Sequence, residues 1–109
     1  MELRPIPRHS ADADQASRLN ERAFPACERV PFDAMYDSMD TEILGVYDGA
    51  ALHGFIILRR CFGMAYVCFF AVEEASRCKG VGAQALRLLQ AWAPDCRLVV
   101  DYEAPDDAA

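Results

Sequence analysis

The sequence is poor in the features that mark several large classes of protein. Positive charge is scarce, because 11 Lys and Arg stand against 17 Asp and Glu, for a net charge of −6. Nucleic acids and anionic membranes are bound through clustered positive charge, so this balance argues against both as partners. The chain contains no apolar run of the ~20 residues that a membrane-spanning helix needs, and its start lacks the apolar core of a signal peptide. A cytoplasmic protein is therefore expected.

Paired cysteines are also missing. The five cysteines are odd in number, and no two of them stand in a Cys-x-x-Cys pattern. This spacing predicts free thiols in a reducing compartment and argues against a zinc site. The two histidines, His9 and His53, are isolated and receive no role. No metal cofactor is expected.

The order of predicted elements indicates one domain covering residues 1–109. Periodicity and breakers predict strands over 2–6, 42–48, 51–60, 65–72 and 97–102, and helices over 10–24 and 81–92. A short further helix is expected to open at Pro31 and to carry Met35 and Met39 on one side. Asp48-Gly49 predicts a hairpin. A hairpin that feeds a strand–loop–helix–strand unit predicts the α/β (α+β) class: a mixed, mostly antiparallel sheet of about five strands, with helices on both faces.

Residues 65–92 are the most informative stretch. Residues 65–72 are a run of aromatic, β-branched and small residues, typical of a strand buried on both faces. Residues 81–92 place their apolar side chains on one face of a helix. Residues 77–83, where the loop passes into this helix, contain two glycines and two cations. A glycine-containing basic loop that opens a helix is suited to binding an anion, because the first amides of the helix lack helical partners and the helix dipole adds positive charge.

Other interpretations of this loop are weighed first. A Gly-x-Gly before a helix can simply be a packing device. A dinucleotide-binding fingerprint needs a third glycine where Ala85 stands, and a P-loop needs Gly-Lys-Ser/Thr, which is absent.

Val72 followed by Arg77-x-x-Gly80-x-Gly82-Ala83 resembles the acetyl-CoA signature of the GCN5-related N-acetyltransferase (GNAT) family. The family often has Gly where this chain has Cys78. The resemblance covers nearly the whole chain, since the predicted element order is that of the family from its first strand through its fifth. It implies an N-acetyltransferase that uses acetyl-CoA as cosubstrate. Two groups of residues are implied in cofactor binding. The pyrophosphate loop comprises Arg77, Cys78, Lys79, Gly80, Val81, Gly82 and Ala83, and the strand that pairs with the pantetheine arm comprises Phe70, Ala71 and Val72.

The acceptor side is implied by a second resemblance. Residues 24–32 are similar to Phe-Pro-x-x-Glu-Arg-x-Pro-Phe in a subgroup of the family, where this loop lines the pocket for the acceptor. Glu28, Arg29 and Phe32 are then candidates for binding a small-molecule or peptide amine. Glu28 and Glu103 are the candidate catalytic bases, although a solvated or ion-paired surface acid is the commoner role of such a carboxylate. Arg29 either binds an acceptor carboxylate or forms a structural ion pair.

The C-terminal residues differ from the family pattern. Family members continue past the fifth strand with a helix and a hairpin, which commonly supply a tyrosine that protonates the departing thiolate. The sequence ends at Ala109 without such a segment, so we expect a truncated fold and weak turnover. Residues 97–102 are expected to expose a strand edge and to pair with a second copy in a homodimer. The alternatives to an enzyme are a catalytically dead acetyl-CoA-binding module and an interaction domain that keeps only the fold.

Overall fold

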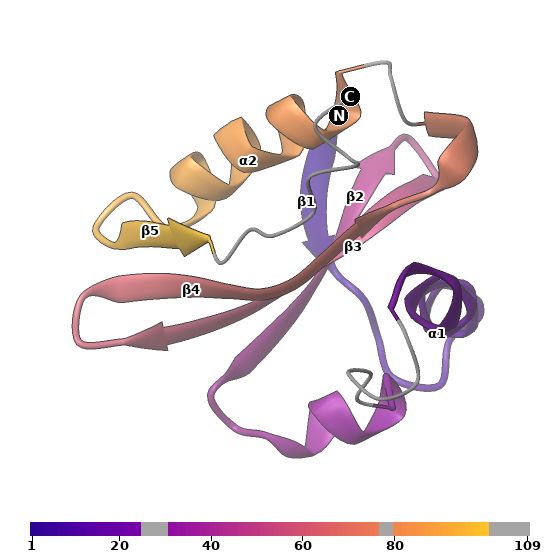
Figure 1. Ribbon diagram of the computed structural model, residues 1–109, viewed down its shortest axis with the longest axis horizontal. Helices are drawn as coiled ribbons and strands as arrows, with labels where there is room; N and C mark the ends of the chain where they lie inside the picture. The colour runs from indigo at the N-terminus through magenta and orange to yellow at the C-terminus, as the bar shows by residue number, and fades with distance from the viewer. Residues whose placement is uncertain (25–30, 77–79, 101–109) are drawn as a thin grey trace.

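The computed structural model describes residues 1–24, 31–76 and 80–100, and they form a five-stranded sheet in the order β1-β2-β3-β4-β5 (Figure 1). The elements, in chain order, are β1 (Glu2–Pro5), α1 (Ala11–Ala23), the 3₁₀ helix η1 (Asp33–Asp37), β2 (Thr41–Asp48), β3 (Ala51–Cys61), β4 (Met64–Val72), the 3₁₀ turn η2 (Glu74–Ser76), α2 (Val81–Trp92) and β5 (Arg97–Val100). Strands β1 to β4 are antiparallel neighbours, and β5 is parallel to β4. The predicted mixed, mostly antiparallel sheet is confirmed.

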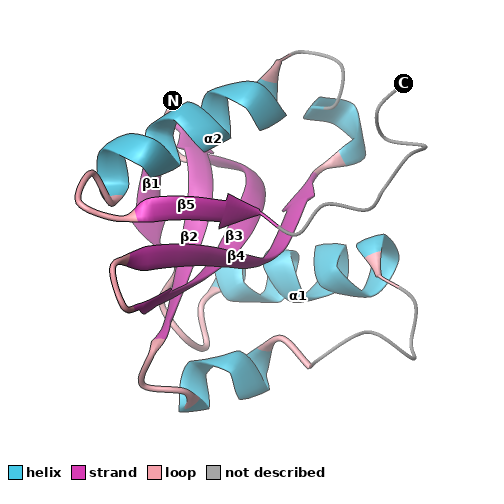
Figure 2. Cartoon of the chain, turned by 60° about the vertical axis from the view of Figure 1, so that its left-hand side comes forward, coloured by secondary structure: helices cyan, strands magenta, loops and turns pink. Residues whose placement is uncertain are grey.

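The two α-helices cover opposite faces of the sheet, as predicted (Figure 2). Each helix presents its small and apolar residues to one buried cluster. The α1 cluster includes Ala13, Ala16 and Leu19 of the helix with Phe55 and Ile57 of β3. The α2 cluster includes Val81, Ala85 and Leu89 of the helix with Ile56 and Leu58 of β3. Strand β2 also contributes to both clusters, for example through Ile43 and Leu44, so β2 and β3 are both buried on both faces.

Two predictions about local structure are wrong. The short element after Pro31 is a five-residue 3₁₀ helix that ends at Asp37, so Met39 lies beyond it and is 99% exposed, while Met35 is buried. Strand β4 is not buried on both faces along its whole length, because Tyr66 and Cys68 are exposed. The α1 cluster reaches β4 only in its later half, at Phe69 and Ala71, and this leaves the earlier half open on that face.

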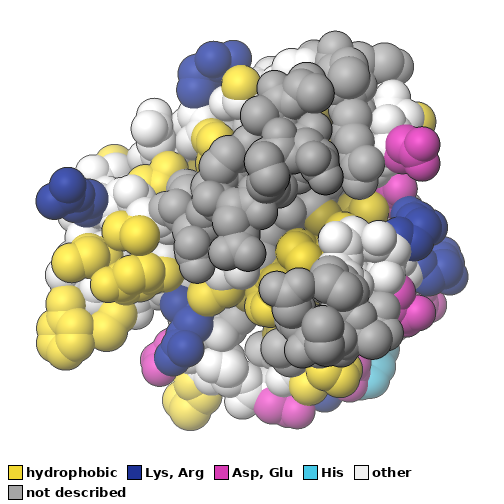
Figure 3. All heavy atoms as spheres, in the orientation of Figure 1, with side chains coloured by type: hydrophobic (Ala, Val, Ile, Leu, Met, Phe, Trp, Pro, Cys, Tyr) yellow, Lys and Arg dark blue, Asp and Glu magenta, His cyan; other side chains and the backbone are white. Residues whose placement is uncertain are grey.

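Both β-hairpin turns contain a glycine with positive φ. Gly49, with φ +62°, follows Asp48 in the β2–β3 hairpin, which confirms the predicted connection. The β3–β4 hairpin turns at Phe62 and Gly63, both with positive φ. Figure 3 shows hydrophobic side chains gathered over the tip of this hairpin, where Phe62 is 96% exposed.

Strand β5 is described as Arg97–Val100 and stands last in the strand order. The remainder of the predicted strand, and the end of the chain, lie outside the described residues. Pairing of residues 97–102 with a second copy therefore stays a prediction. No helix in the described part of the chain is both long and apolar enough to cross a bilayer.

Candidate functional site

Strand β4 extends further along β3 than along the described part of β5. It pairs with β3 from Met64 as far as Val72, whereas its described pairs with β5 stop at Val67. One extra residue in β4, Cys68, interrupts the register with β3 directly after that point. A bulge of this kind bends a strand and changes the faces to which the following side chains point. The segment 70–72, which was predicted to pair with the pantetheine arm, therefore extends past the last described residue of β5.

The start of α2 lies beside this segment. Its N-cap is Gly80, in the left-handed conformation with φ 74°, and the N-cap provides no side-chain hydrogen bond. The first turn of the helix contains no acidic residue. A Cβ built on Gly82 would lie 4.0 Å from the Phe70 Cζ, so the first turn of α2 and β4 face each other across the Phe70 ring. Two groups predicted from separate stretches of sequence, the pyrophosphate loop and the pantetheine strand, are thus neighbours at Gly82 and Phe70.

The turn that precedes the loop is tied to β3 and to α1. His53 accepts a hydrogen bond from the Glu73 amide at its main-chain oxygen (2.8 Å), and its Nδ1 lies 2.7 Å from the Ser76 hydroxyl. The Glu73 carboxylate accepts hydrogen bonds from Arg22 (2.9 Å) and from the Gln15 amide (3.1 Å) of α1. Sequence reasoning gave His53 no role, because its partner Ser76 lies 23 residues away and no motif joins them.

The acceptor loop is described only at its two ends. The Phe24 ring packs edge-on against Phe69 of β4, with the ring centres 5.2 Å apart. At the other end, Phe32 is 3% exposed and packs against Phe55 of β3 at 5.3 Å. Phe24 and Phe32 therefore both pack in the α1 cluster. The residue that Phe24 contacts, Phe69, directly precedes the predicted pantetheine segment 70–72. Phe32 is a core residue here, and its contact with an acceptor stays a prediction.

Six predicted site residues lie outside the described part of the chain. These are Glu28, Arg29, Arg77, Cys78, Lys79 and Glu103. Both candidate bases are among them, so the identity of the catalytic base stays a prediction. Within the described ranges, no group of three or more His, Cys, Asp and Glu is arranged to hold a metal ion.

The cysteine at the bulge of β4 is poorly suited to nucleophilic chemistry. Although part of Cys68 is exposed, partial desolvation raises the pKa of its thiol, and the nearby Arg59 offsets this only in part. A thiol reacts as its thiolate, so a raised pKa keeps Cys68 protonated near neutral pH. Like Cys61 and Cys96, it is a free cysteine. The bulge of β4 therefore carries no activated thiol at Cys68.

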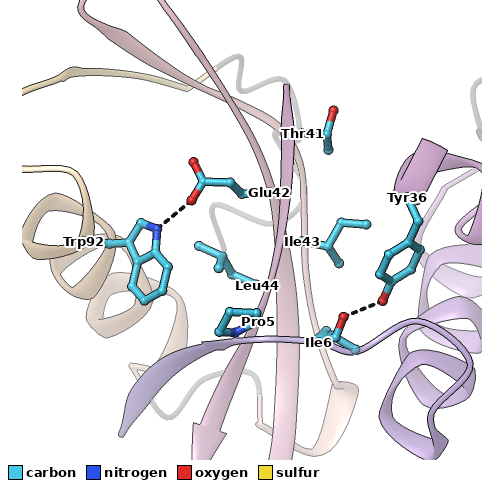
Figure 4. A pocket seen from close by; sticks show the side chains of 8 residues that line it. All are labelled: Pro5, Ile6, Tyr36, Thr41, Glu42, Ile43, Leu44 and Trp92. Carbon is cyan, nitrogen blue, oxygen red and sulfur yellow. Dashed lines mark hydrogen bonds between the residues drawn. The ribbon is translucent and has the colours of Figure 1, made fainter. Parts of the chain in front are cut away.

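A cavity of about 250 Å³ lies at the other edge of the sheet, where β1 ends beside β2 (Figure 4). The Trp92 indole donates to Glu42 on one side of β2 (3.0 Å), and the Tyr36 hydroxyl donates to the Ile6 oxygen on the other (2.8 Å). The residues that line it are Pro5, Ile6, Tyr36, Thr41, Glu42, Ile43, Leu44 and Trp92. None of them was predicted to be functional, and the cavity is separate from the Phe70–Gly82 contact. A smaller cavity of about 80 Å³, between α1 and η1, is lined in part by Phe32.

Residues 13–109 match the model of a family described as the acetyltransferase (GNAT) family. No curated protein sequence matches the chain significantly.

Solved structures share the fold at low sequence identity. A protein of Bacteroides thetaiotaomicron described as a GNAT-family acetyltransferase superposes with a TM-score of 0.82 and 22% identity, over 96% of this chain and 62% of its own. An aminoglycoside antibiotic 6′-N-acetyltransferase of Acinetobacter haemolyticus superposes with a TM-score of 0.65 and 15% identity, over 94% of this chain and 79% of its own. An aminoglycoside 6′-N-acetyltransferase in complex with coenzyme A superposes with a TM-score of 0.65 and 18% identity, over 86% of this chain and 56% of its own. The chain thus spans 62% of the length of the Bacteroides protein.

Proposed function

The chain belongs to the acetyltransferase (GNAT) family, and from this premise we propose that it binds acetyl-CoA and transfers the acetyl group to an amine. The observation that carries the proposal is the start of α2 at Gly80, with Gly82 next to Phe70 of β4. Among the described residues, no side chain caps the α2 N-terminus and no acid stands in its first turn. Its free amides and the positive end of its dipole therefore suit a pyrophosphate.

The remaining length of the cofactor suits the later half of β4. A pantetheine arm carries two amide groups, which can pair with a strand as an added strand would. Residues 70–72 are the proposed partner of this arm, because Phe70 lies next to Gly82 at the start of α2. In this arrangement the nucleotide end lies at Gly80 and Gly82, and the thioester end lies toward Phe69, where Phe24 begins the acceptor loop.

The chemistry requires two proton movements. The acceptor must lose a proton before its nitrogen lone pair can attack the carbonyl carbon, since an alkylammonium has a pKa near ~10.4. Glu28 or Glu103 would accept that proton, directly or through water. A main-chain amide of β4 near Phe70 would stabilise the oxyanion. The carbon–sulfur bond then breaks, and the thiolate that leaves needs a proton from an acid or from water.

Cofactor binding and turnover are separate claims for this chain. It spans 62% and 56% of two of the solved relatives, so the activity of a full-length acetyltransferase is not carried over with the fold. A second candidate function is a module that binds acetyl-CoA without turnover. The amides at Gly80 and Gly82 serve both candidates, whereas only the enzyme needs a base and an acid.

Calorimetric titration with CoA tests the binding step. We expect a Kd of roughly micromolar order, as a few charge-assisted hydrogen bonds give once the cost of association is subtracted. Pantetheine, which lacks the pyrophosphate, is the matched control ligand and should bind far more weakly. Equal affinity for CoA and pantetheine, or no heat of binding with CoA at about millimolar concentration, contradicts the proposed site.

Release of the CoA thiol from acetyl-CoA then separates the two candidates. Because two of the solved relatives are aminoglycoside 6′-N-acetyltransferases, aminoglycosides are the first acceptors to test, followed by polyamines and peptide N-termini. The net charge of −6 favours such cationic acceptors. Thiol release that depends on the amine supports the enzyme. Tight CoA binding without release under any acceptor supports the binding module.

A further inference from the structure

The first half of β4 leaves one side of the sheet exposed. Ala65 and Val67 point into the α2 cluster and are buried, whereas Tyr66 between them points to the opposite side and is 39% exposed. The α1 cluster lies on that opposite side, but it takes in β4 only at Phe69 and Ala71. The apolar face of a sheet is normally covered by a second layer of structure, so an exposed part of such a face is a candidate interface.

Two rows of side chains make up this exposed part. Residues that are paired across neighbouring strands share a face, and the register gives one row of Arg59, Tyr66 and Val99 and a second row of Cys61, Met64 and Arg97. We call these six residues the open face. Met64 and Val99 are half-buried, and the other four are exposed. The Tyr66 hydroxyl lies 3.2 Å from the Met64 sulfur, so the two rows contact each other on β4.

The open face carries positive charge on both sides of β4. Arg59 lies on β3 and Arg97 on β5, and no acid is among the six residues. Neither arginine forms an ion pair with a described residue. The neighbouring Arg60 differs, because it points to the other side of the sheet and pairs with Glu42 at 2.6 Å. A partner that suits the open face therefore places apolar groups over β4 and carboxylates on both flanks.

The turn beside the open face contains an unfavourable residue. Phe62 has φ 51°, in the left-handed region that favours glycine, and its side chain is 96% exposed. An exposed aromatic residue in this conformation contributes neither a relaxed turn nor buried area to the isolated chain. Residues held in such conformations are concentrated at functional sites. This second observation also indicates that the tip of the β3–β4 hairpin makes contacts outside the chain.

We propose that the open face binds an amphipathic helix of another polypeptide, with an apolar stripe over Met64 and Tyr66 and carboxylates facing Arg59 and Arg97. The dimensions agree, because β3 and β5 lie about 10 Å apart across β4 and a helix is about 10 Å wide. Helix α1 packs in the same way on the other half of this side of the sheet. The inference is independent of the cofactor site.

Two other occupants suit the open face less well. A second copy that docked through the same face would bring the unpaired arginines of both chains into one interface, where like charges repel. An anionic membrane would attract these arginines, but the net charge of −6 on the whole chain opposes its approach.

Two synthetic peptides of about 18 residues, long enough to form a helix, test the proposal. Both carry a leucine stripe; one has Glu on both flanks of the stripe, and the other has Lys at the same positions. Fluorescence anisotropy at low salt should give a Kd of roughly micromolar order for the Glu peptide. The Lys peptide should bind at least about tenfold more weakly, because its charges would meet two arginines.

Substitutions in the open face should change this preference. The double variant Arg59→Glu, Arg97→Glu should bind the Lys peptide more tightly than the Glu peptide. Tyr66→Ser should weaken both peptides about tenfold, because it removes the aromatic ring at the centre of the face. These side chains are exposed, so the fold should persist, which urea unfolding checks.

Arg60→Gln is the matched control for Arg59→Gln. Both remove one positive charge from neighbouring positions of β3, but Arg60 points to the other side of the sheet. Arg59→Gln should raise the Kd for the Glu peptide about threefold, the effect of losing one exposed ion pair. Arg60→Gln should leave it unchanged.

Binding of the Glu peptide that depends on Arg59 and Arg97 supports the proposal. Equal affinity for the two peptides, or no binding of the Glu peptide at about millimolar concentration, overturns it. Self-association of the protein alone in sedimentation, if Tyr66→Ser abolishes it, assigns the face to a second copy and overturns the helix partner. Co-sedimentation with phosphatidylserine vesicles, if Arg59→Gln reduces it, assigns the face to a membrane and overturns the proposal as well.

Discussion

The two α-helices differ most at their N-termini. Helix α1 is capped by Ser10, whose hydroxyl accepts the Ala13 amide at 3.1 Å, and Asp12 and Asp14 stand in its first turn. Helix α2 begins at Gly80, which has no side chain to cap it, and no acid follows in its first turn. In α1, the chain itself supplies the hydrogen-bond acceptor and the negative charge that a helix start favours. The described residues of α2 provide neither, and we propose that a ligand supplies both.

The helices are alike in the other respects that matter for folding. Each buries one stripe of small and apolar residues against its own face of the sheet, such as Leu19 in α1 and Leu89 in α2, both nearly inaccessible to solvent. Each ends with a main-chain bond from its C-cap, from Phe24 to Asn20 and from Ala93 to Leu89. The contrast at the N-termini is therefore specific, and it is best explained by a function of α2 that α1 does not have.

The largest expected effect comes from placing an acid at the open helix start. Gly82→Asp adds negative charge and bulk where the pyrophosphate is predicted to bind. It should raise the Kd for CoA by about 100-fold or more, because at least one charge-assisted hydrogen bond is lost and repulsion is added. The fold should persist, since the nearest atom to a Cβ at this position, the Phe70 Cζ, is 4.0 Å away. Calorimetry with CoA measures the effect.

Ala11→Asp is the control for this change, because it places the same charge at the start of α1. Ala11 is exposed, and an acid in the first turn of a helix is favourable. We expect an unchanged Kd for CoA. If the two variants bound CoA equally well, the functional difference between the helix starts would be refuted.

The second effect concerns the conformation of Gly80. Gly80→Ala should lower the free energy of unfolding by about 1–2 kcal/mol, the cost of the left-handed conformation for a residue with a Cβ. The cost is confined to the backbone, because a Cβ built here meets nothing within 4 Å among the described atoms. Asparagine tolerates this conformation better, so Gly80→Asn should be the milder variant. Urea unfolding checks both, and equal stability of Gly80→Ala and the parent protein would contradict the N-cap geometry.

A smaller effect is expected at the start of α1. Ser10→Ala removes the hydroxyl that accepts the Ala13 amide and should cost about 1 kcal/mol of stability. The Kd for CoA should not change, because this helix start has no predicted ligand. If the Kd for CoA changed after correction for the folded fraction, the start of α1 would also contribute to CoA binding, and the contrast between the two helix starts would fail.

Local patterns were sufficient to predict the order of the strands and α-helices. The Asp48-Gly49 turn and the Gly80 loop each lie within a few residues of the structure that they specify, so a single sequence reveals them. The GNAT family was identified for the same reason, because its signature falls within twelve residues, 72–83.

What could not be predicted depends on bulges. The extra residues His53 in β3 and Cys68 in β4 shift the register, and with it the face to which each following side chain points. A bulge is fixed by the partner strand rather than by a local motif. The contact between His53 and Ser76 was therefore missed. The exposure of Tyr66 has another cause, because the α1 cluster reaches β4 only at Phe69 and Ala71. Met39 was misplaced for a different reason, because helical spacing alone does not say that η1 ends at Asp37.

Gly82→Ala is the smallest of these changes and best separates a packing role of this glycine from a ligand-binding role. It is expected to raise the stability of the protein and to weaken CoA binding. A glycine within the first turn of a helix is either needed for packing or kept for close approach of a ligand. In the described structure Gly82 is not confined, since an added Cβ would make only an ordinary contact with Phe70 at 4.0 Å. Gly82→Ala should therefore stabilise the protein by about 0.5–1 kcal/mol, through helix propensity and a less flexible unfolded chain. The same methyl group would stand where the pyrophosphate must approach the backbone, so the Kd for CoA should rise severalfold.

Urea unfolding and calorimetry on this variant separate the two explanations. Lower stability with unchanged affinity would make Gly82 a packing residue and would remove the main support for the cofactor site.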